Sequence, residues 1–97
     1  MVRIDEKFME QAGLTEMPEP EKQAFMEHAE QELEMRVGRR LAAGLTPEQL
    51  QEFEGITSQV EAVRFLETNV PTFRDAVRET YQEFLAEVQR DRESILA

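Results

Sequence analysis

The sequence predicts an all-α fold, a compact bundle of about five helices in which residues 1–97 form a single helical domain. Good helix formers dominate the chain, mainly Glu, Gln, Ala, Leu, Met and Arg. No segment alternates β-branched and polar residues as a half-buried strand would. Helix start and stop signals then divide the chain into two long helices, about 20–43 and 72–94, and three short ones.

The first predicted helix is short. It begins after Asp5, whose carboxylate can cap the helix, and ends at about Ala12, with Gly13 in the C′ position. Residues 14–20 are expected to connect it to the next helix, because Pro18 and Pro20 lie too close together for regular helix.

The first long helix is expected to run from about residue 20 to about residue 43 and to stop at Gly44. Acidic residues in its first turn and arginines in its last turn suit the helix dipole. Thr46 and Gln49 then predict a capping box for the next short helix, with Pro47 at its first position and an end at Gly55.

The last two predicted helices follow Ser58 and Thr72, with Val70 as the alternative start of the last one. The first of them, ending at about Asn69, is apolar over much of its circumference, so we expect it to be sandwiched between other helices. Thr72 with Asp75 predicts a weaker capping box for the final helix, 72–94. That helix has one apolar stripe at helical spacing, expected to be core: Phe73, Val77, Tyr81, Phe84, Leu85 and Val88.

The helix at 20–43 presents two faces without charge. One is apolar and expected to be core: Phe25, Ala29, Leu33, Val37 and Leu41, with Met26 beside it. The other, here called the uncharged face, consists of Ala24, His28, Gln31, Met35, Gly38 and Ala42. Its alternating spacing of 4 and 3 residues is typical of a surface on which a second helix packs. A second protein chain, the first short helix or solvent could each cover it.

The end of the same helix and the residues after it, 36–45, hold three arginines and no acidic residue; the arginines are Arg36, Arg39 and Arg40. They are a candidate anion contact, or they complement the helix C-terminus, with Glu32 and Arg36 as an i,i+4 pair. The net charge of −10 argues against direct nucleic-acid binding and against an anionic membrane surface.

No constellation for chemistry is evident. The chain has no cysteine, which excludes disulfides and thiol catalysis, and no glycine-rich phosphate loop. His28 is the one histidine, and Glu32 lies four residues after it, but a metal site needs three or four ligands. We therefore expect no enzymatic activity, no cofactor and no metal. The N-terminus lacks the apolar core of a signal peptide and no stretch is apolar enough to cross a membrane, so a cytoplasmic location is expected.

Four segments resemble a family of short, acidic, all-helical bacterial proteins described only as a domain of unknown function. They are residues 8–14 with Pro-Glu-Pro-Glu-Lys at 18–22, Glu-Met-Arg-Val-Gly at 34–38, Leu-Thr-Pro-Glu-Gln-Leu at 45–50 with Phe53, and Phe-Leu-Glu-Thr-Asn-Val-Pro at 65–71. The resemblance implies a compact helical fold and supplies no activity or site residues. The leading hypothesis is a non-catalytic protein-interaction module, self-associating through the uncharged face. The alternative is an acidic regulator or inhibitor that mimics nucleic acid and binds a nucleic-acid-binding protein.

Overall fold

A computed structural model describes residues 3–96 and confirms the all-α prediction. These residues form six helices, which are α1 (Glu6–Ala12), α2 (Glu19–Ala42), α3 (Pro47–Glu54), α4 (Gln59–Asn69), α5 (Phe73–Arg90) and α6 (Arg92–Leu96). None of the described residues is in a strand. The bundle is elongated, with principal extents of 45 × 22 × 19 Å.

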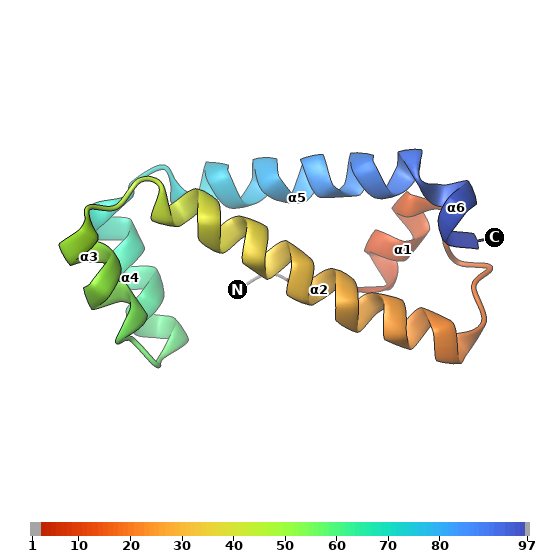
Figure 1. Cartoon of the computed structure of the whole chain (residues 1–97), viewed down its shortest axis with the longest axis horizontal. Coiled ribbons are helices and arrows are strands. Elements are labelled where there is room, and N and C mark those ends of the chain that lie inside the picture. Colours follow the sequence, from red (N-terminus) through yellow and green to blue (C-terminus); the bar gives the residue numbers. More distant parts are fainter. Residues whose placement is uncertain (1–2, 97) are drawn as a thin grey trace.

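The two long helices determine the shape of the bundle (Figure 1). The C-terminal end of α2 lies close to the N-terminal end of α5, and the two helices diverge toward the opposite end, where α1 fits between them. The hairpin of α3 and α4 projects across the end at which α2 and α5 converge. The core therefore lies mainly between α1, α2 and α5, and α4 adds to it from one end.

Most predicted helix ends are confirmed. The Asp5 carboxylate accepts a hydrogen bond from the Phe8 amide at 3.0 Å, and Gly13 ends α1 in the left-handed region at φ 77°. Thr46 and Gln49 make both hydrogen bonds of the predicted capping box. These local bonds satisfy amides that the helices themselves leave unpaired, which explains why the sequence locates these ends so well.

The predicted capping box of the final helix does not form. Thr72 is the N-cap of α5, but its side chain makes no capping hydrogen bond. Its backbone has ψ of 12° instead of the extended conformation found at Asp5 and Thr46. The Asp75 carboxylate accepts a hydrogen bond from Arg78 at 2.8 Å, so the capping partner is engaged elsewhere.

The predicted helix at 72–94 is two helices, because the chain turns at Asp91. After the turn, the Arg92 Nε donates a hydrogen bond to the carbonyl oxygen of Gly13 at 2.7 Å. Gln89 also donates to the carbonyl oxygen of Gln11, at 2.8 Å. The turn therefore joins the end of α5 to the C-terminus of α1, a long-range contact that no local sequence pattern encodes.

The predicted core faces are confirmed, although some residues of each stripe are only partly buried. On α2, Ala29, Leu33, Val37 and Leu41 are buried, and the stripe of α5 packs against the same core. Phe8 of α1 lies at the centre and is fully buried. Its ring centroid is 5.7 Å from that of Tyr81 and 5.8 Å from that of Phe84. Aromatic contacts of this kind add to the free energy gained by apolar burial.

One expectation about packing is wrong. The helix at 59–69 is not sandwiched between others, because α3 covers only one of its sides, through Phe53 on Phe65 at 5.6 Å between ring centroids. Phe65 and Leu66 are buried on the packed side, whereas Val60 is 62% exposed. The apolar residues of α4 are therefore divided between the core and the surface.

Candidate interaction surfaces

The uncharged face of α2 is open to solvent. Ala24, His28, Gln31, Met35 and Gly38 are exposed, and Ala42 is partly buried. The alternative that α1 covers this face is wrong, because α1 lies between α2 and α5 and buries Phe8 and Met9 in the core (Figure 1). The rest of residues 3–96 therefore leaves this side of α2 uncovered, and a further helix has room to pack against it.

Two residues give this face its shape. Met35 is 47% exposed, and its sulfur accepts a hydrogen bond from Arg39 Nη2 at 3.2 Å. At Gly38, no atom from outside its own stretch of helix lies within 4 Å of the position that a Cβ would occupy. The flexible apolar side chain of Met35 therefore lies close to Gly38, where the lack of a side chain lets another helix approach the backbone.

Carboxylates border the uncharged face on one side. Glu27, Glu30 and Glu34, with Gln31, line a shallow hollow of about 250 Å³ on α2. One oxygen of Glu30 accepts a hydrogen bond from the backbone amide of Ile4 at 3.4 Å. The negative charge of this border repels an acidic partner on the face and attracts a basic one.

The arginines of the candidate anion contact do not act as one cluster. Arg36 makes a bidentate pair with Glu87 of α5, at 2.6 Å and 3.1 Å, and the predicted pair with Glu32 is confirmed at 3.0 Å. The hydrogen bonds from Arg36 hold the pKa of Glu87 below its usual range, and those carboxylates raise the pKa of Arg36. The Arg36 guanidinium also lies 5.0 Å from the centroid of the Phe84 ring. This residue therefore links α2 to α5.

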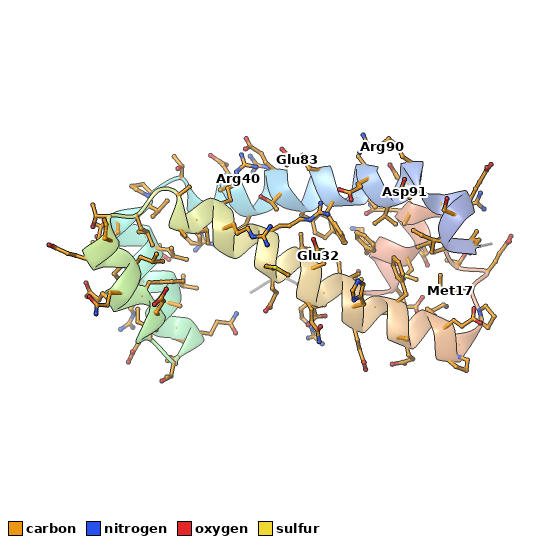
Figure 2. The ribbon with its side chains drawn as sticks, in the orientation of Figure 1. Met17, Glu32, Arg40, Glu83, Arg90 and Asp91 are labelled. Atoms are coloured by element: carbon orange, nitrogen blue, oxygen red, sulfur yellow. The ribbon has the colours of Figure 1, made fainter. Side chains whose placement is uncertain are left out.

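Arg40 makes the same kind of link one turn further along α2. It pairs with Glu79 and with Glu83, the latter at 3.5 Å, where α2 and α5 come together (Figure 2). Within the described chain, Arg39 alone of the three predicted residues has no ion pair with a carboxylate. An anion contact stays a prediction, and it would have to displace carboxylates of α5 from Arg36 and Arg40.

A second surface lies between α4 and α5, and the sequence reasoning missed it. A cleft of about 440 Å³ is lined by Val63 of α4 and by residues of α5 that follow each other at helical spacing. Its apolar residues are Val63, Phe73, Val77 and Tyr81, with Arg74 and Arg78 at its rim. Burial raises the pKa of Tyr81, and the charge of Asp5 adds to this effect. The apolar residues spread around much of the circumference of α4 were the available signal, because a short neighbour such as α3 cannot cover both sides.

The described residues show no arrangement suited to metal binding. His28 is exposed and lines a hollow with Glu32, but no group of three or more His, Asp or Glu side chains in residues 3–96 is placed to hold an ion. No helix of this part of the chain combines the length and apolar character needed to cross a membrane.

A family model described as "Protein of unknown function (DUF5663)" matches residues 8–88. The chain belongs to this family. The predicted resemblance to a family of unknown function is thereby confirmed. No curated protein and no solved structure shows significant similarity to the chain. The segment matched by DUF5663 begins in α1 and ends in the last turn of α5, so it contains both surfaces described above.

Proposed function

We propose that this member of DUF5663 is a non-catalytic protein-interaction module that self-associates through the uncharged face of α2. The observation that carries the proposal is that this face is open in the folded chain, although it has the spacing of a helix-packing surface. The cysteine-free composition suits a reducing, cytoplasmic location for such a module.

The size and shape of the face support this role. From Ala24 to Gly38 it extends over roughly 20 Å of helix at 1.5 Å per residue. Met35 supplies apolar area in the C-terminal half of the face, and its unbranched thioether adapts to the surface that it contacts. A glycine in the middle of a helix lowers stability by about 1 kcal/mol relative to alanine. Close packing of a second helix at Gly38 would explain why a glycine stands there.

Electrostatics opposes self-association. Each copy carries a net charge of −10, and Glu27 and Glu34 border the face. Two copies therefore repel each other, and added salt screens that repulsion. We expect a weak association that becomes tighter as ionic strength rises.

The test is the molar mass of the full chain in solution, by size-exclusion chromatography with light scattering, from about 1 µM to about 1 mM. The wild-type mass is expected to rise from 11.3 kDa toward twice that value. Met35→Glu should keep the monomer mass throughout with unchanged helicity, because it replaces the largest apolar side chain of the contact by a charge. Gln82→Glu, an exposed position on α5, adds the same charge elsewhere and should associate like the wild type. A wild-type monomer at all concentrations, or equal effects of both variants, contradicts the proposal.

The second candidate function is the acidic regulator, which the hollow lined by Glu27, Glu30 and Glu34 favours. Its partner would be a basic, nucleic-acid-binding protein, and salt would weaken that complex steeply. The sign of the salt dependence therefore separates the two functions, because salt strengthens self-association and dissociates the complex with a basic partner.

A further inference from the structure

The cleft between α4 and α5 continues onto the outer side of α4. Gln59 and Val63 line both the cleft and an adjoining hollow of about 500 Å³, to which Val60, Arg64 and Glu67 also contribute. Together the two form one shallow groove with an apolar floor, here called the α4–α5 groove. It is distinct from the uncharged face, which is on α2.

The charge of this groove is opposite to that of the chain. Three arginines and one glutamate line it, namely Arg64, Arg74, Arg78 and Glu67, in a protein with 21 acidic and 11 basic residues. Acids outnumber bases in the hollow on α2 and in the one between α2, α5 and α6. The α4–α5 groove is therefore the hollow, among these, that attracts negative charge.

The arginines of the groove are available to a partner. Arg74 pairs with Glu67 at 3.2 Å and Arg78 with Asp75 at 2.8 Å, but all four side chains are more than half exposed. Exposed pairs of this kind contribute little to stability, so carboxylates of a bound partner can replace them at small cost. No ion pair joins Arg64 to a carboxylate of residues 3–96.

The floor has the dimensions of a helix-binding site. Phe73, Val77 and Tyr81 follow each other at every fourth residue of α5, a distance of about 12 Å, and Val63 lines the same cleft from α4. Phe73 is only 4% exposed and the Arg74 guanidinium lies 4.9 Å from its ring centroid, so Val63, Val77 and Tyr81 supply most of the accessible apolar area. Two turns of an amphipathic helix present apolar residues over the same distance, at i, i+3 or i+4, and i+7. Carboxylates on the flanks of that helix would meet the arginines at the rim in charge-assisted hydrogen bonds.

We propose that the α4–α5 groove binds an acidic amphipathic helix of a partner protein. The apolar floor supplies the contact area and the three arginines select the charge. This site does not depend on the self-association of α2, so either proposal can fail without the other.

The test uses the full chain and a synthetic peptide of about 18 residues with Leu at helical spacing and Glu on both flanks. Binding is followed by fluorescence anisotropy of the labelled peptide and by amide chemical shifts of the ¹⁵N-labelled chain. We expect shift changes along α4 and the first half of α5, and weaker binding at higher salt. A peptide of the same pattern with Lys in place of Glu should bind at least tenfold more weakly.

Matched variants locate the site. The double variant Arg64→Glu/Arg78→Glu should weaken binding of the acidic peptide roughly tenfold or more. Lys7→Glu/Arg39→Glu makes the same change in net charge at exposed positions outside the groove and should weaken binding of the peptide less than threefold. Val60→Glu changes a side chain that is 62% exposed, so little packing is lost, and it should also weaken binding. Failure of the acidic peptide to bind, equal losses for both double variants, or shift changes confined to α2 would overturn the proposal.

Discussion

The two ends of the bundle differ in how completely they are packed. Where α1 lies between α2 and α5, Phe8, Met9, Leu14 and Leu33 are fully buried. At the other end, α3 has no buried residue, and α4 buries Phe65 and Leu66 but leaves Val60 exposed. The first end supplies most of the apolar burial that stabilises the fold, whereas the second holds a small core and a groove on its surface.

Apolar periodicity alone therefore does not distinguish core from interaction surface. The stripe of α5 serves both, because Phe84 and Val88 are buried near α1 while Val77 lines the α4–α5 groove. Which part is covered depends on the length and position of neighbouring helices. A change in the packed end should therefore alter folding, and a change in the open surfaces should alter binding.

The largest effect is expected from Phe8→Ala. This removes a fully buried ring with two aromatic neighbours, and comparable substitutions cost about 3–5 kcal/mol of unfolding free energy. Phe53→Ala removes a ring that is only partly buried at the other end, and less than half of that loss is expected. Urea denaturation followed by circular dichroism measures both. Equal losses for the two variants would contradict the difference in packing.

A smaller effect, of opposite sign in the two regions, is expected for replacement of two glycines by alanine. Gly13→Ala places a side chain at φ 77° with its Cβ 2.7 Å from Arg92 Nε, so a loss of about 1–2 kcal/mol is expected. Gly38→Ala adds a methyl group to an open helical position and should stabilise the monomer by about 0.5–1 kcal/mol. The midpoints of thermal unfolding should therefore move in opposite directions. If Gly38→Ala instead destabilises a dilute monomer, the α2 face is covered within the chain.

The smallest effect concerns the ion pairs. Arg36→Met should cost about 1 kcal/mol at neutral pH, a modest value because Arg36 and Glu87 are 31% and 39% exposed. Since Arg36 lowers the pKa of Glu87 in the folded state, this stabilisation is complete above about pH 5 and is lost as the pH falls through the folded-state pKa. The two unfolding free energies should thus converge in acid. Arg74→Met breaks the more exposed pair with Glu67 and should change stability little at any pH. A difference for Arg36→Met that persists unchanged below pH 3 would argue against an electrostatic origin.

Local signals in the sequence predicted the fold well. Asp5, Gly13 and Thr46 act within one helical turn, so their roles follow from neighbouring residues alone. The turn at Asp91 was missed because the contact made after it, between Arg92 and Gly13, joins residues that are 79 positions apart in the sequence. The uncharged face was found because all its members lie on one helix. The α4–α5 groove was not, because it requires the relative position of two helices.

Self-association through the uncharged face of α2 can be observed residue by residue in the ¹⁵N chemical shifts of the full chain, recorded as a function of its concentration. We expect the amide signals around Ala24, His28, Gln31, Met35 and Gly38 to shift progressively with concentration, and more strongly at higher salt. Signals of the α4–α5 groove should stay in place. Concentration-independent signals on α2, or shifts confined to the groove, would contradict the claim.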